Sequence, residues 1–111
     1  MTPKDPRTNE IFAALADETR RAVVLRLSEG GETTASRLAE ELPVSRQAIA
    51  KHLAALEEAG LVASARVGRE NLYRFTPAPL SEAVSWIASV GGDWDGRLAR
   101  LRKHLEGGKG R

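Results

Sequence analysis

The stretch Val44–Val62, VSRQAIAKHLAALEEAGLV, decides the fold because it has the pattern of a helix with two unlike faces. Ile49, Leu53 and Leu56 recur at the spacing that places side chains on one side of a helix. The opposite side is polar, with small alanines between longer side chains. We therefore predict a helix over residues 46–59 that ends at Gly60 and packs one face against a hydrophobic core.

A shorter helix is predicted immediately before it. Thr34 can open the segment ASRLAEEL, residues 35–42, whose apolar residues fall at i, i+3, i+4 and i+7. Pro43 interrupts the pattern, because proline lacks an amide hydrogen and disfavours a helical residue before it. Ser45 can cap the next helix at once. Two helices joined by about three residues have the spacing of a helix-turn-helix.

The periodicity changes from helical to alternating after Gly60. LVASAR (61–66) and NLYRF (71–75) have the pattern of short strands around the turn VGRE (67–70), whose glycine permits a positive φ. A β-hairpin directly after the second helix of a helix-turn-helix is the arrangement of a winged helix. The sequence therefore predicts a mainly α-helical fold with a small β-hairpin, a winged helix-turn-helix with its wing at 62–75.

Two further helices are predicted on the N-terminal side of this unit. Thr8 can cap the first, and Asp17 can cap the second, which ends at Gly30–Gly31. The apolar side of the first helix is formed by Ile11, Phe12 and Leu15. We expect residues 1–7 to be a flexible arm and residues 107–111 a flexible tail, with one domain over residues 8–106.

A long last helix is predicted over about residues 79–106. Its apolar residues follow a heptad seam with one gap at Gly91. The seam is formed by Leu80, Val84, Ile87, Trp94, Leu98 and Leu101. One small domain cannot cover such a helix, so we expect a homodimer with this helix in the interface. The sequence leaves open whether the helix breaks at Gly91–Gly92, where Asp93 can cap a second half.

Composition narrows the class of protein. The chain has 111 residues, which suit one domain, and its net charge of +2 is too small to indicate nucleic-acid binding by itself. It has no cysteine, so disulfides and thiolate metal sites are excluded, and we expect no cofactor. No apolar run reaches the ~20 residues of a membrane span, and the N-terminus lacks the apolar core of a signal peptide. We expect a cytoplasmic protein.

The outward face of the helix 46–59 carries side chains that suit DNA. Arginine can make two hydrogen bonds to guanine and glutamine two to adenine, and alanine keeps a helix slim enough for the major groove. The candidate DNA-binding residues of this helix are Ser45, Arg46, Gln47, Ala50, Lys51 and His52. On the hairpin, Arg66 and Arg69 suit the minor groove or flanking phosphates. The alternative is an ordinary solvated face, since two basic residues on a surface are common.

Other classes of protein remain as alternatives. A near-neutral charge also suits a winged helix that binds protein instead of DNA. A metal-responsive repressor would need an atypical carboxylate–histidine site, but Asp93 and Asp95 project about 200° apart around a helix, and His104 and Glu106 do likewise. We therefore expect no metal site. An enzyme is least favoured, because the sequence shows neither a nucleophile with its base nor a phosphate-binding glycine loop.

Four stretches resemble the ArsR (ArsR/SmtB) family of bacterial winged-helix regulators. They are ALADETRRAVVLRLSEG (14–30), RLAEELPVSRQAIAKHLAALEEAGLV (37–62), VGRENLYRFTPAPL (67–80) and WDGRLARLRKHLE (94–106). The resemblance implies a homodimeric repressor that binds a partly palindromic operator. It also implies a dimer interface built from the last helix and from the first, which contains Ile11, Phe12 and Leu15.

The chain departs from the family at the positions that sense metals. Many members use a cysteine pair in the third helix, where this chain reads ETTASRLAEEL (32–42). Others use aspartate and histidine pairs in the last helix, and DWDGRLARLRKHLE (93–106) lacks their spacing. The resemblance therefore implies a regulator whose signal is an organic molecule, a partner protein or no effector at all.

Overall fold

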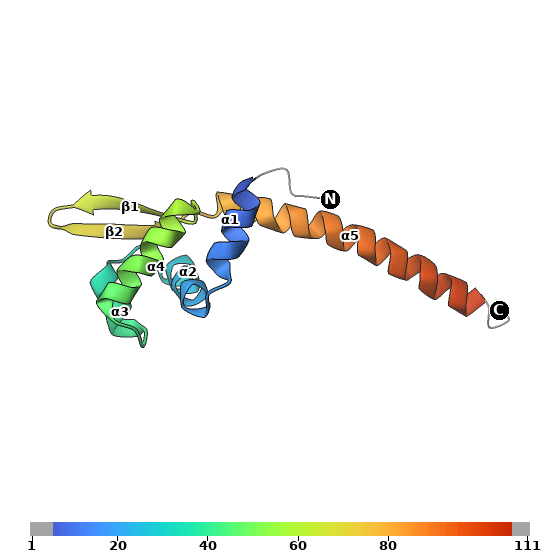
Figure 1. Ribbon diagram of the computed structural model, residues 1–111, viewed down its shortest axis with the longest axis horizontal. Coiled ribbons are helices and arrows are strands. Elements are labelled where there is room, and N and C mark those ends of the chain that lie inside the picture. Colours follow the sequence, from blue (N-terminus) through green and yellow to red (C-terminus); the bar gives the residue numbers. More distant parts are fainter. Residues whose placement is uncertain (1–5, 108–111) are drawn as a thin grey trace.

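A computed structural model describes residues 6–107 of the chain. In chain order its elements are α1 (Pro6–Leu15), α2 (Glu18–Gly30), α3 (Ala35–Glu41), α4 (Arg46–Glu58), β1 (Val62–Val67), β2 (Glu70–Phe75) and α5 (Ala78–Gly107). The first four helices and the hairpin form a compact domain, and α5 extends away from it (Figure 1). This arrangement confirms the predicted winged helix-turn-helix.

Three helices begin at the residues that the sequence marks as caps. The side chains of Asp17, Thr34 and Ser45 each accept a hydrogen bond from the backbone amide three residues later, at 3.0, 3.1 and 3.1 Å. Such bonds satisfy an amide that the first turn of a helix leaves without a partner, and each typically contributes about 1 kcal/mol. The starts of α2, α3 and α4 are therefore set by local sequence.

The end of α4 is formed by a glycine in the left-handed region. Gly60 has a φ of 80°, and its amide donates to the carbonyl of Glu57 at 3.0 Å. The amide of Leu61 donates to the carbonyl of Leu56 at 2.9 Å, which completes a Schellman motif. This turn leads the chain directly from the helix into the hairpin.

The hairpin is an antiparallel pair of strands anchored at its base. Val62 pairs with Phe75 and Val67 with Glu70, so the turn at the tip begins with Gly68, which has a φ of 63°. Thr33, between α2 and α3, exchanges two backbone hydrogen bonds with Tyr73, of 3.1 and 2.8 Å. The base of the hairpin is thus held against the helices, while its tip projects from the domain (Figure 1).

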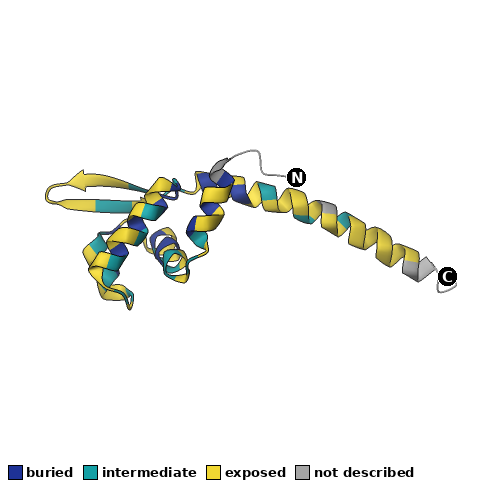
Figure 2. Cartoon of the chain, in the orientation of Figure 1, coloured by how far each residue is buried: buried dark blue, intermediate teal, exposed yellow. Residues whose placement is uncertain are grey.

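The core lies beneath α4. Ile49, Leu53 and Leu56 have no exposed surface, as the period of the opening stretch predicts. They pack with buried residues of every other helix and of the start of β1. The largest fully buried side chains among these partners are Ile11, Val23, Leu38 and Leu61. Burial of one face fixes the rotation of α4 about its axis, and therefore fixes which side chains face outward (Figure 2).

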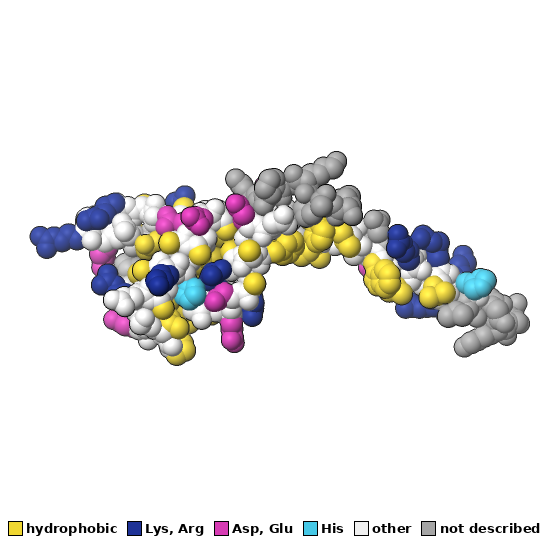
Figure 3. Space-filling model, viewed as in Figure 1, with side chains coloured by type: hydrophobic (Ala, Val, Ile, Leu, Met, Phe, Trp, Pro, Cys, Tyr) yellow, Lys and Arg dark blue, Asp and Glu magenta, His cyan; other side chains and the backbone are white. Residues whose placement is uncertain are grey.

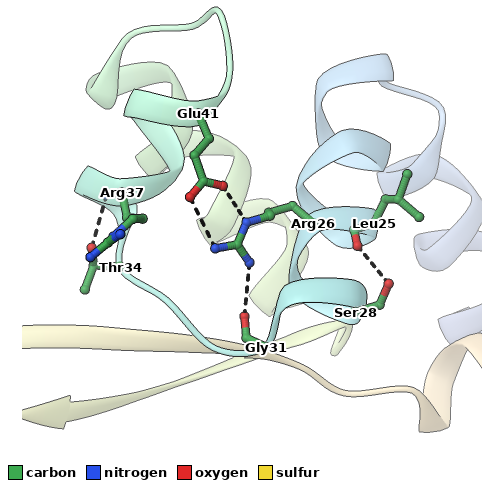
Figure 4. A network of polar contacts seen from close by, with 7 residues as sticks. All are labelled: Leu25, Arg26, Ser28, Gly31, Thr34, Arg37 and Glu41. Carbon is green, nitrogen blue, oxygen red and sulfur yellow. Dashed lines mark hydrogen bonds and ion pairs between the residues drawn. The ribbon is translucent and has the colours of Figure 1, made fainter.

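An ion pair joins α2 to α3. Arg26 binds the carboxylate of Glu41 and also donates to the carbonyl of Gly31 at 3.4 Å (Figure 4). The hydrogen bond from Arg26 lowers the pKa of Glu41, and the pKa of Arg26 is raised in return. These contacts help to set the angle at which α3 leaves α2, ahead of the turn into α4.

The start of the chain differs from the prediction. The first helix begins at Pro6, and Thr8, which we expected to cap it, lies inside the helix and is buried. Proline suits the first position of a helix, because its missing amide hydrogen would have no partner there. Residues 1–5 of the expected arm and residues 108–111 of the expected tail lie outside the described residues.

The last helix is continuous. It runs for 30 residues through Gly91–Gly92, which answers the question that the sequence left open. Near its start, the ring of Trp86 meets the ring of Phe12 edge to face, with centroids 5.8 Å apart and planes at 67°. This contact joins α5 to α1, and beyond it the helix leaves the domain (Figure 1). No helix in the described part of the chain is long and apolar enough to cross a membrane.

Candidate nucleic-acid interface

A groove with a volume of about 600 Å³ lies between α4 and the hairpin. It brings together four of the side chains that the sequence singled out, from two elements separated in the chain. They are Arg46, Gln47, Ala50 and Arg69. The predicted helix 46–59, here α4 and called the recognition helix below, and the predicted wing therefore border one shared surface.

The burial of Ile49 explains how α4 presents its polar side chains. Because this residue faces the core, Arg46, Gln47 and Ala50 are exposed on the outer side of the same two turns. Lys51 is also exposed but is not among the residues that line the groove. The guanidinium of Arg46 and the carboxamide of Gln47 are adjacent in the sequence, and the small Ala50 lies about one turn further along, so both groups can meet the edges of bases with little steric hindrance.

Ser45 combines a structural contact with a geometry that suits phosphate. Its hydroxyl oxygen accepts the capping hydrogen bond from the amide of Ala48, so its own hydrogen is available to donate. Ser45 is exposed at the N-terminus of α4, where the helix dipole favours a negative group. A DNA phosphate beside the major groove would match both features.

Arg66 and Arg69 of the hairpin differ in where their side chains lie. Arg66 folds back over the turn, and its Nε donates to the carbonyl of Gly68 at 3.2 Å. Arg69 is exposed in the turn and lines the groove beside α4. Basic side chains gather at the tip of the hairpin (Figure 3). Glu70 also lines the groove and reduces the positive charge there.

His52 has a different environment from the other candidates on α4. Only 19% of its side chain is exposed, and its Nδ1 accepts a hydrogen bond from the Nε of Arg20 at 3.4 Å. The same nitrogen lies 3.9 Å from a carboxylate oxygen of Asp17. The Nδ1 side of the ring therefore faces α2, and the DNA contact of His52 stays a prediction.

Several polar residues of the groove were missed at the level of sequence. They are Thr34, Ser36, Asn71 and Tyr73. Each offers hydrogen-bonding groups without charge, and none belongs to a pattern that marks it as functional. The pairing of Thr33 with Tyr73 is what carries the start of α3 to the hairpin, and this long-range contact has no signal in a local pattern.

An apolar face on α5 is open to solvent. Val84, Ile87, Trp94, Leu98 and Leu101 of the predicted seam have 39–57% of their surface exposed. Val90, which the heptad pattern did not include, is 46% exposed. Figure 3 shows hydrophobic side chains along this helix, beyond its contact with α1.

The residues of α1 and of the start of α5 that we expect at the dimer interface are less exposed than the seam further along α5. Ile11 has no exposed surface, because it faces the core of its own domain, so the expectation that it contacts a partner is corrected. Leu15 and Leu80 are half-buried and pack against the same core. Phe12 is 36% exposed and lies beside Trp86. Of the predicted α1 residues, Phe12 is therefore the one best placed to meet a partner.

The described residues contain no group of three or more histidine, cysteine, aspartate or glutamate side chains that could hold a metal ion. The side chains of Asp93 and Glu106, which we weighed as ligands, lie outside the described part of the structure.

These features define a class of protein. A helix-turn-helix followed by a hairpin, with arginine and glutamine exposed on the second helix, is the architecture of a winged-helix nucleic-acid-binding protein. Comparison with protein families agrees, since a model described as a helix-turn-helix domain matches residues 15–65.

Similarity to known proteins identifies the family within this class. The HTH-type transcriptional regulator YuzN of Bacillus subtilis is 44% identical over 84 residues, covering 69% of this chain and 91% of the relative. The transcriptional repressor SdpR of the same organism is 33% identical over 79 residues, covering 71% and 87%. The solved structure of an ArsR-like transcriptional regulator from Rhodococcus has a TM-score of 0.75 and 46% identity, covering 87% and 91%. The chain belongs to the ArsR family of transcriptional regulators, as the motifs in its sequence indicate, and it is not an enzyme.

Proposed function

We propose that two copies of this chain bind a pseudo-palindromic DNA operator and repress transcription from it. Each copy places α4 in the major groove and the hairpin against the neighbouring minor groove or phosphates. The observation that supports this most directly is the groove in which Arg46 and Gln47 of α4 share a surface with Arg69 of the hairpin. Related chains that are named as repressors support the sign of the regulation.

The chemistry of the groove favours DNA over a protein partner. Two of its lining residues are arginines and five carry amide or hydroxyl groups, against one acidic residue, Glu70, so the surface offers donors to phosphates and base edges. A protein-binding groove would present a buried apolar anchor instead. The exposed large apolar side chains lie mainly along α5, away from this groove.

The proposal of a dimer is based on the exposed apolar face of α5. Ile87, Trp94 and Leu101 are each 50% exposed or more in a single chain, and they follow the spacing of a helix that packs on another helix. A second copy of the same helix has the matching pattern. Two-fold pairing would present two α4 helices to the same side of the DNA, about one helical turn or roughly 34 Å apart.

Selection of binding sites from a random DNA pool tests the proposal. We expect enrichment of an inverted repeat whose half-sites are separated by about one turn of DNA. If each copy makes about four phosphate contacts, log K should fall with log salt concentration at a slope near −7. Failure to enrich any inverted repeat would contradict the proposal. No gel shift even at low salt would favour a winged helix that binds protein.

A further inference from the structure

Arg20 joins three elements of the domain. It lies in the first turn of α2, and its Nη1 donates to the carbonyls of Ala13 and Ala14 in the last turn of α1, at 3.4 and 3.3 Å. Its Nε donates to the Nδ1 of His52 on α4 at 3.4 Å. One side chain therefore links the end of α1 to the flank of the recognition helix.

Asp17 completes this cluster. Its Oδ1 caps α2 by accepting from the amide of Arg20 at 3.0 Å, and it lies 3.9 Å from the Nδ1 of His52. The backbone hydrogen bond from Arg20 is the main cause that lowers the pKa of Asp17, and the nearby His52 contributes. The carboxylate is thus ionised throughout the range in which a histidine changes its charge.

The two contacts of His52 need different states of its ring. Nδ1 can accept from Arg20 only when it carries no hydrogen, so this contact belongs to the neutral imidazole. Protonation places a hydrogen on Nδ1 and a second positive charge beside the guanidinium. The carboxylate of Asp17 then becomes the acceptor. Glu10 of α1 and Glu58 of α4 border the groove that contains Arg20, and Lys51 precedes His52 on its own helix.

We propose that Arg20 and His52 are positioning residues for DNA recognition, which link α4 to the end of α1, and that protonation of His52 breaks the link through Arg20 and replaces it with an ion pair to Asp17. The inference rests on the proposed function. Because the contact of Phe12 with Trp86 joins α1 to α5, the cluster lies between the recognition helix and the proposed dimer interface. It therefore controls how the two recognition helices of a dimer match the spacing of two half-sites.

The measurable consequence is a loss of specificity in acid. Protonated His52 adds positive charge near DNA, which strengthens binding to every sequence. The ratio of affinity for the selected operator to affinity for a scrambled duplex removes this common term. We expect that ratio to fall about five- to tenfold between pH 7.5 and pH 5.5 at constant salt, a change typical of weak coupling between sites.

The chain has 2 histidines, and replacing each with asparagine shows which of them causes the pH dependence. In His52→Asn the side-chain oxygen can accept from Arg20 as Nδ1 does, but it does not titrate, so the ratio should stay constant across this pH range. His104→Asn is the matched control, because His104 lies far along α5, and it should keep the pH dependence of the natural chain. Arg20→Lys lacks the Nε donor and should show the low ratio already at pH 7.5.

The outcomes distinguish this inference from the function on which it rests. A natural chain that binds its operator with the same ratio at both pH values would overturn the inference alone. A pH dependence that persists in His52→Asn, or disappears in His104→Asn, would also overturn it. Absence of any preferred sequence at either pH would overturn both. Circular dichroism at each pH identifies a variant that has unfolded, and His52→Asn decides the matter if Arg20→Lys does not fold.

Discussion

The recognition helix α4 and the terminal helix α5 carry similar apolar patterns but meet opposite environments. On α4, Ile49, Leu53 and Leu56 have no exposed surface, whereas on α5, Ile87 and Trp94 are 50% and 56% exposed (Figure 2). The core of the domain closes over α4 within one chain. Among residues 6–107, which the structure describes, α1 covers only part of the apolar face of α5. A helical pattern therefore identifies an apolar face, and only the fold shows whether the same chain can bury that face.

The largest effect on stability is expected from a substitution on the buried face of α4. Leu53→Ala should lower the free energy of unfolding by about 2–5 kcal/mol, because it removes a fully buried side chain and leaves a cavity. Leu25→Ala is a matched control, since Leu25 is 56% exposed, and it should change stability by less than about 0.5 kcal/mol. Urea unfolding at one protein concentration measures both. Equal losses in the two variants would contradict the assignment of the core.

A substitution on the exposed apolar face of α5 should prevent dimer formation without unfolding the domain. Ile87→Glu places a charge on the exposed seam of α5 and should convert a dimer of 24.0 kDa (2 × 12.0) to a chain of 12.0 kDa. Operator affinity should fall by about 10²-fold, because the two half-sites are no longer bound together. Ser89→Glu adds the same charge to an exposed position off the seam and should remain dimeric. Sedimentation equilibrium decides between these states.

The groove predicts a further contrast, between α4 and the hairpin. Arg46→Ala should cost about 1–3 kcal/mol and relax base preference at one position of each half-site. Arg69→Ala should weaken binding to all sequences similarly, and it should reduce the salt slope by about 1 for each phosphate that the arginine neutralises. Competition assays with single-base variants of the operator measure both effects. Uniform losses for Arg46→Ala on every sequence would remove it from base readout.

Gly68 in the hairpin turn and Gly92 in α5 differ in backbone conformation. A Cβ added at Gly68 or at Gly92 would meet no atom within 4 Å, so the two sites differ in backbone conformation and not in space. Gly68 has a φ of 63°, and Gly68→Ala should cost about 1 kcal/mol. Gly92 is helical, and Gly92→Ala should stabilise the helix by about 0.5–1 kcal/mol. Thermal unfolding should move in opposite directions in the two variants.

The smallest effect concerns the ion pair between α2 and α3. The pKa of Glu41 is lowered, so its contribution to stability is fully present above the usual carboxyl pKa and is lost as pH falls through the lower value of the folded state. Glu41→Gln should therefore be slightly less stable than the natural chain at pH 7, and the difference should vanish in acid. Glu40→Gln, on the same helix and exposed, is the control. Thermal unfolding between pH 3 and pH 7 should show no such convergence for the control.

Local sequence predicts much of this fold and part of its site. The caps Asp17, Thr34 and Ser45 place the starts of three helices, and the apolar period of α4 predicts both its core and its outer face. These features depend on residues a few positions apart. The sequence therefore predicts that Arg46 and Gln47 are exposed together.

Features that depend on distant contacts were predicted less well. Ile11 faces the core because α1 packs across the domain, and His52 is turned toward Arg20, which lies 32 residues away. Thr8 was expected to cap a helix that in fact begins at Pro6. The sequence also left open whether α5 continues through Gly91–Gly92, and the structure shows that it does.

The most direct test of the account is the number of chains bound to one operator. Sedimentation of the protein with a labelled duplex that carries the selected inverted repeat measures this number, together with its dependence on each half-site. We predict that two chains, or 24.0 kDa (2 × 12.0), add to each duplex, and that destroying one half-site weakens binding by about 10²-fold. One chain per repeat, bound equally well after a half-site is destroyed, would contradict a dimer that reads DNA with paired α4 helices.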